Sequence, residues 1–256
     1  EPVARLLAAS HLLASSQQSA AISLLDELSR DPNSLVAWAA RAQLLRTHPI
    51  ALPIAGIEQQ RRDFADAPGW LQPGVSYAFG RAWVASNQPL RAASAFLRCG
   101  LTEPCDRAFA AQAMLEAGLA LSQAGWRRES DAVWRETVAK LGDQRRVMAE
   151  LASRDPQRWG PTGTEHSAVE PAPLPLSRPL QPTAFGAVND EGHFLAALRD
   201  RGLSRLAAQY CEWAFDCPDL SPQRRAELSI ELARSLTVEA LAAPPAERER
   251  IWSRVE

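Results

Sequence analysis

Cysteine is the residue type whose spacing in this chain could do chemistry. The four cysteines form two pairs of identical separation, Cys99 with Cys105 and Cys211 with Cys217. Each pair spans the expected end of a helix, where a chain that doubles back brings two Cα atoms within the roughly 7 Å of a disulfide. The repeated spacing favours two disulfides and therefore an extracytoplasmic location, periplasmic or at the cell surface, with a cytoplasmic location left open. The alternative is that all four are buried thiols in helical cores.

The other polar residues predict neither a catalytic nor a metal site. The histidines lack ligand spacing with the cysteines, and the sequence contains no phosphate-binding glycine loop, zinc-protease helix or nucleophile elbow. Asp and Glu recur at the spacing of solvated helix faces. We therefore expect a non-enzymatic protein that holds no metal or cofactor. Two alternatives are a catalytic α/α barrel with inward-facing carboxylates and an aromatic ligand platform, although tryptophans such as Trp83 and Trp134 fit core positions.

Composition places the chain among ordinary globular proteins. It has 256 residues, of which 46% are hydrophobic and 23% are charged. The net charge of -2 gives no electrostatic case for a nucleic-acid partner. No apolar run is close to about 18 residues, the length that a membrane-spanning helix needs. Because the chain starts at Glu1 and ends inside an expected helix, we interpret it as a trimmed or processed piece of a longer protein.

A spaced pattern of small, bulky and turn-forming residues recurs along the first half of the chain. Its three copies are Ala8, Ser15, Ala20, Leu24 and Pro32; Gly80, Asn87, Ala92, Phe96 and Pro104; and Gly118, Gly125, Ser130, Trp134 and Gly142. The first residue is small, so a second helix can approach it closely. Asn87 and Gly125 tolerate positive φ, which suits a tight turn between two helices. The pattern therefore predicts consecutive helical hairpins.

This pattern resembles the tetratricopeptide repeat (TPR), a unit of about 34 residues made of two antiparallel helices. Trp38 also fits, four residues ahead of Ala42, where the signature tryptophan of the family belongs. The resemblance covers roughly residues 1–157, and its second unit, which lacks the small/bulky pair, fits least well. It implies an all-α fold, a right-handed α-solenoid of TPR-like helix–turn–helix units.

The expected organisation has three parts. Residues 1–157 form the helical-repeat domain, 158–190 a proline-rich extended linker, and 191–256 a smaller C-terminal helix-pair segment. Within the first part, Trp70 and Leu71 lie in a loop rich in proline and glycine, and we expect both side chains to pack inward.

The resemblance also implies a partner-binding concave groove lined by the first helix of each unit. Carried over by register, its positions are Arg5, Ala9, Ala39, Gln43, Tyr77, Arg81, Leu115 and Leu119, with Gln112 and Gln123 nearby. The family's clamp for C-terminal carboxylates is missing, since only Arg5 and Arg81 are basic. A mostly apolar groove of this kind suits an amphipathic helix, a proline-rich strand or the chain's own linker.

The expected function is a non-enzymatic scaffold for protein–protein interaction, or an accessory subunit of a larger bacterial assembly. The partners are therefore proteins, with no nucleic acid and no direct membrane span. An incomplete solenoid exposes apolar end faces, which makes a homo-oligomer a further option. The alternative function is the non-catalytic superhelical domain of a larger enzyme, for example one that degrades cell walls.

Overall fold

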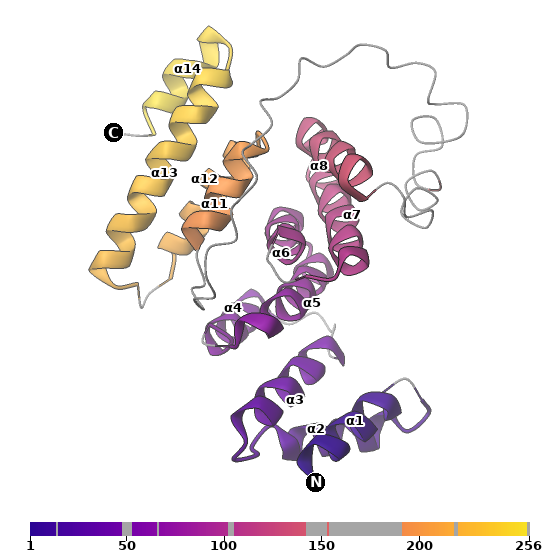
Figure 1. The fold of residues 1–256 in the computed structure, drawn as a ribbon. Coiled ribbons are helices and arrows are strands. Elements are labelled where there is room, and N and C mark those ends of the chain that lie inside the picture. The colour runs from indigo at the N-terminus through magenta and orange to yellow at the C-terminus, as the bar shows by residue number, and fades with distance from the viewer. Residues whose placement is uncertain are drawn as a thin grey trace. The chain divides into compact units, whose positions relative to one another are not determined.

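The computed structural model describes residues 1–13, 15–47, 53–65, 67–101, 105–141, 153, 191–217 and 220–254 (Figure 1). Within these ranges the regular structure is helical, which confirms the predicted all-α class. The helices divide into two compact units, one ending at Cys105 and the other starting at Asp106, and each is described by itself. Several expectations fall outside the described residues. These are the linker 158–190 with its two domain boundaries, and the repeat positions Pro104 and Gly142.

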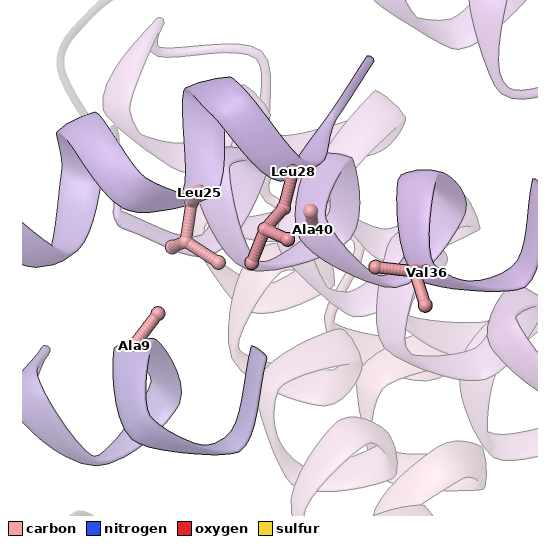
Figure 2. Close-up of a cluster of buried hydrophobic side chains, with 5 residues drawn as sticks. All are labelled: Ala9, Leu25, Leu28, Val36 and Ala40. Carbon is pink, nitrogen blue, oxygen red and sulfur yellow. The ribbon is translucent and has the colours of Figure 1, made fainter. Parts of the chain in front are cut away.

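The first unit begins with three helices around a small aliphatic core. They are α1 (Pro2–Leu12), α2 (Gln18–Leu28) and α3 (Ser34–Thr47). Figure 2 shows their buried side chains: Ala9, Leu25, Leu28, Val36 and Ala40. Ala9 is fully buried because its methyl group lets α1 lie close to the leucines of α2. The Asn33 side chain accepts a hydrogen bond from the Leu35 amide at 3.1 Å and so caps α3.

The same unit continues with α4 (Ile54–Asp63), a short 3-10 helix η1 (Gly69–Leu71), α5 (Gln72–Ala85) and α6 (Pro89–Leu101). The central helix is α5, which packs against α3, α4, η1 and α6. A row of aromatic rings connects the elements, with centroid distances of 5.5 Å from Trp38 to Phe64 and 6.1 Å from Phe64 to Phe79. The α5–α6 turn is closed by Asn87, whose φ of 54° is in the left-handed region.

The second unit opens with a longer hairpin, α7 (Arg107–Gln123) and α8 (Arg127–Leu141). The Asp106 carboxylate caps α7 by accepting hydrogen bonds from the amides of Ala108 and Phe109. Gly125, with φ of 80°, forms the turn, and the Trp126 amide returns a hydrogen bond of 2.9 Å to the Leu121 carbonyl. The predicted pairing of these two helices is thus observed.

Four further helices complete the second unit: α11 (Glu191–Asp200), α12 (Ser204–Phe215), α13 (Pro222–Ala242) and α14 (Pro245–Trp252). Gly202, with φ of 72°, turns α11 into α12. The longest of the four, α13, packs against α11, α12 and α14. Its inner face shares an apolar core with its neighbours, made of Ala208, Leu236, Ala240 and Ile251.

Two polar contacts join α8 and its preceding turn to the α11–α12 region within the second unit. Arg201 donates through Nε to both carboxylate oxygens of Glu136 at 3.0 Å, and both side chains are mostly buried. The guanidinium of Arg205 lies 4.1 Å from the centre of the Trp126 ring. These contacts bring together segments far apart in the sequence. No described helix is long and apolar enough to cross a lipid bilayer.

Candidate protein-interaction surface

Two hairpins contain the close helix contact that the spacing predicts. A Cβ atom placed on Gly80 would lie 2.5 Å from the Phe96 ring, and one on Gly118 would lie 2.1 Å from Trp134 Nε1. A larger side chain at either position would force the ring or the helices to shift, because real Cβ atoms essentially never show contacts this short. The aromatic ring of the second helix therefore lies against the backbone of the first. Each hairpin is a tightly packed pair that fixes the outward face of its first helix.

Four predicted groove positions of the first unit have different environments. Arg5 forms an exposed ion pair with Glu27 of α2 at 2.5 Å. Gln43 is half-buried, and its Oε1 atom is fully buried without a hydrogen-bond donor among the described residues. Tyr77 is half-buried, with its ring centroid 5.2 Å from that of Phe96. Arg81 is exposed and makes no ion pair or hydrogen bond with the residues that the structure describes.

Two alanines predicted by the same register are less accessible. Ala9, as described above, lies in the core between α1, α2 and α3, so the expectation that it lines a groove is wrong. The reason is that α1 turns this small residue toward α2 to achieve close packing. Ala39 is half-buried on α3.

The outward face of α5 combines three kinds of side chain. Tyr77, Arg81 and Val84 follow one another at helical spacing, and Val84 is 41% exposed. The face thus offers on one stripe a phenol, an aliphatic group and a guanidinium that pairs with none of the described residues. Arginine forms paired hydrogen bonds with carboxylates, and tyrosine adds apolar area at little entropic cost. This composition is typical of protein-binding surfaces.

The four predicted positions of the second unit lie on α7. Leu115 is only 3% exposed and packs against Trp134, and Leu119 is partly buried against the same cluster. Gln112 donates a hydrogen bond of 3.0 Å to Glu116 on the same helix, and Gln123 is exposed at the helix end. The two leucines therefore serve mainly the internal packing of the α7–α8 hairpin.

The two predicted disulfides are not formed, because all four cysteines are free thiols. In the first pair, the Cys99 side chain is in hydrogen-bond contact with Cys105. Burial and this neighbouring thiol raise the pKa of Cys99. In the second pair, burial and then Glu231 raise the pKa of Cys211 to about 12. Thiols held protonated in this way are poor nucleophiles, and the buried-thiol alternative describes Cys99 and Cys211.

Trp70 is a surface residue that the sequence interpretation placed wrongly. It was expected to pack inward, but its side chain is 54% exposed on η1, directly before α5. The preceding Pro68 and Gly69 start a short 3-10 helix in which Leu71, not Trp70, is partly buried. A bulky residue inside a proline–glycine loop gives no periodicity from which its orientation can be read. Exposed tryptophan is a common anchor in protein interfaces.

A group of charged residues gathers where α12, α13 and the end of α14 meet. The pKa of the Glu239 carboxyl is raised, mainly by burial. The nearby charges of Arg254 and Arg205 lower this pKa, whereas those of Glu212 and Glu129 raise it. One oxygen of Glu239 is fully buried without a described hydrogen-bond donor. Arg254 also forms an ion pair with Glu212. Within the described residues, no group of three or more His, Cys, Asp or Glu side chains has the geometry to hold a metal ion.

Comparison with known proteins adds no identification. No protein-family model, curated protein or solved structure matches the chain.

Proposed function

We propose that this chain is a non-enzymatic protein-interaction scaffold or accessory subunit, built from TPR-like hairpins, that binds a protein partner through the outward face of α5. The TPR-like assignment is supported by two hairpins with the same 16-residue step from a buried glycine to the aromatic ring that covers it. It is further supported by the packing of α1 on α3 and of α3 on α5, because stacked repeats place alternate helices side by side.

The observation that carries the proposal is the contrast between the two sides of α5. Most of the helix is buried, including Phe79, Gly80 and Trp83, against α3, α4 and α6. One stripe, formed by Tyr77, Arg81 and Val84, is left accessible. A helix held on its other sides presents such a stripe without having to order it on binding, which lowers the entropic cost of association.

The chemistry of the stripe indicates the kind of partner. An apolar side chain of the partner contacts Val84 and the Tyr77 ring, while a carboxylate pairs with the exposed guanidinium of Arg81. We infer an amphipathic protein segment that carries at least one acidic residue. The proposal is not tied to a compartment, because the predicted extracytoplasmic location depended on disulfides and the cysteines are thiols.

The test is capture of partner proteins from the source organism on the purified chain, followed by binding measurements with the recovered partner. The test variant is Arg81→Glu with Val84→Asp, which leaves Tyr77 on Phe96 and the hairpin core intact. The control is Arg30→Glu, a charge reversal at another exposed arginine, just after the end of α2. Loss of two interface contacts is expected to weaken binding about tenfold or more, since each 1.4 kcal/mol is a factor of ten.

The outcomes separate the alternatives. Weaker binding by the α5 variant and unchanged binding by the control support the proposal. Undiminished binding by a folded α5 variant overturns the assignment of this face. If the wild-type chain captures no protein at all, the scaffold function fails, and a helical domain separated from a larger enzyme becomes the better account.

A further inference from the structure

The second unit has an exposed apolar stripe along α13, on the side opposite its core face. Ile230 is 54% exposed, Val238 40% and Leu241 68%. These residues recur every three to eight positions and therefore lie on one side of the helix. Beside them is an open hollow of about 540 Å³, lined by Arg199, Ile230, Ala233, Arg234, Thr237 and Val238. Exposed apolar side chains gathered along a hollow mark interaction sites on soluble proteins.

Toward the start of α13 the charges beside this stripe do not balance. Arg224 forms ion pairs with two carboxylates, Glu191 of α11 and Glu227 one turn further along α13. Glu191 is mostly buried and also accepts a hydrogen bond from Tyr210, so its carboxylate is held inside the unit and does not reach the surface stripe. Glu227 remains 47% exposed. One guanidinium shared by two carboxylates leaves a net negative charge at Glu227.

Around Arg234, two helical turns after Glu227, the charge imbalance has the opposite sign. Glu231 forms ion pairs with two guanidinium groups, Arg199 of α11 and Arg234 of α13, both at 2.6 Å. The pair with Arg199 is mostly buried, with 14% exposure on each side, whereas Arg234 is 63% exposed. One carboxylate shared by two guanidinium groups leaves a net positive charge at Arg234. Ile230 lies between the two unbalanced charges, three residues after Glu227 and four before Arg234.

We propose that the exposed face of α13 is a docking surface for a second copy of this chain, which packs its own α13 against it in antiparallel orientation about a two-fold axis near Ile230. This arrangement places Glu227 of each copy opposite Arg234 of the other, so both unbalanced charges are neutralised. The proposal goes beyond the α5 function and does not depend on it.

The charges on two copies of α13 complement each other only when the helices are antiparallel. In an antiparallel pair, residues equally far before and after the axis face each other, and Glu227 and Arg234 lie on either side of Ile230 at nearly equal distance. The two Ile230 side chains meet at the centre, and Val238 faces Gln223. A parallel pair in register would instead oppose Glu227 to Glu227 and Arg234 to Arg234. The contact is a single pair of helices, which places it at the small end of protein interfaces and predicts a weak dimer.

The test uses charge reversal at the two positions in the full chain. Sedimentation velocity over a roughly hundredfold concentration range, wide enough to follow a change of two decades in affinity, measures dimer formation. Wild type is expected to dimerise with rising concentration. Glu227→Arg and Arg234→Glu are each expected to raise the dimer dissociation constant about tenfold or more, because each places like charges opposite each other at two points. Circular dichroism checks that both variants fold, since both side chains are on the surface.

The decisive experiment mixes the two single variants and measures whether they form a dimer together. In the mixed dimer, the new Arg at 227 faces the new Glu at 234, and the native Arg234 faces the native Glu227. Both contacts are then attractive, so the mixture is expected to recover dimers that neither variant forms alone. The double variant Glu227→Arg with Arg234→Glu is expected to dimerise like wild type. A monomeric wild type at every concentration, single variants that dimerise unchanged, or a mixture that stays monomeric would each overturn the proposal.

Discussion

The α5–α6 and α7–α8 hairpins have the same register but different chemistry. In both, the turn residue follows the buried glycine by 7 positions and the covering aromatic ring follows it by 16. In the first hairpin, Phe96 covers Gly80 and contributes only apolar contact. In the second, Trp134 covers Gly118 and donates from Nε1 to the Leu115 carbonyl at 3.5 Å.

The residue 12 positions after the glycine is likewise apolar in the first hairpin and polar in the second. It is Ala92 in the first hairpin and Ser130 in the second, and the Ser130 hydroxyl donates to the Gly118 carbonyl at 2.7 Å. In both hairpins the glycine on the first helix lets an aromatic ring of the second helix lie against its backbone. At the two equivalent positions the first hairpin has Ala92 and Phe96, which carry no polar side-chain atom.

The largest expected effect comes from filling the two glycine contacts. Gly118→Ala should lower the free energy of unfolding by about 2–3 kcal/mol and Gly80→Ala by about 1–2 kcal/mol, because overpacking outweighs the gain in helix propensity. The order follows the shorter Cβ distance at Gly118. Urea unfolding of the full chain measures both. Gly74→Ala is the matched control, since nothing lies within 4 Å of its Cβ position, and it should be neutral or stabilising. Equal losses at all three glycines would contradict the packing account.

The two turns should respond differently to substitution of their left-handed residue. Gly125→Ala is expected to destabilise the second hairpin by roughly 1–2 kcal/mol, because a Cβ at φ of 80° is strained. Asn87→Gly should change stability by no more than a few tenths of a kcal/mol, since asparagine already tolerates the left-handed region. Thermal unfolding distinguishes the two. A loss of more than about 1 kcal/mol for Asn87→Gly would show that the Asn87 side chain has a role beyond its backbone angle.

Exchanging the polar group between the hairpins tests whether the two have equivalent geometry. Ser130→Ala removes a buried hydrogen bond and should reduce the free energy of unfolding by about 1 kcal/mol. Ala92→Ser introduces the hydroxyl at the equivalent position, 12 residues after Gly80, and should cost less than about 1 kcal/mol if the Gly80 carbonyl accepts its hydrogen bond. The pair is measured by urea unfolding. If Ala92→Ser proves more damaging than Ser130→Ala, the two hairpins are not equivalent in geometry.

The smallest expected effect is a pH dependence of stability from two glutamates of the second unit. The raised pKa of Glu239 means that its ionised form is less stable in the folded chain. This stability is therefore present below the ordinary glutamate pKa of 4.5 and is lost as pH rises through the raised value. Glu239→Gln should be more stable than wild type at pH 7, and the difference should vanish in acid.

Glu227 provides the matched control of opposite sign. Hydrogen bonds from Arg224 lower its pKa, so its contribution is present above 4.5 and is lost as pH falls. Glu227→Gln should therefore be no more stable than wild type at pH 7. Melting temperatures of both variants across this pH range check the two signs. A Glu239→Gln variant that is less stable at neutral pH would contradict the buried environment of this carboxyl.

Much of the fold could be predicted because helical periodicity and turn residues are local signals. The glycine-to-aromatic step predicted the contacts of Gly80 and Gly118, and Asn87 and Gly125 predicted the turns. The environments of single side chains could not be predicted in this way. Ala9 and Leu115 were read by register as groove residues, yet both are buried, because the orientation of a helix about its own axis depends on neighbours far along the chain.

The binding features show the same division. The α5 stripe was partly anticipated through Tyr77 and Arg81, but the exposure of Trp70 was not. The α13 face was also missed, since its unbalanced charges arise from ion pairs to α11 that only the folded structure brings together. Sequence spacing indicates which side of a helix a residue occupies. It does not indicate whether that side is covered.

The most direct test of the interaction account is a hydrogen-exchange footprint of the full chain with and without its captured partner. The account predicts that peptides from α5, residues 72–85, gain protection when the partner binds, whereas peptides from α2 do not change. Protection confined to other helices, with α5 unchanged, would contradict the assignment of the α5 face as the binding surface.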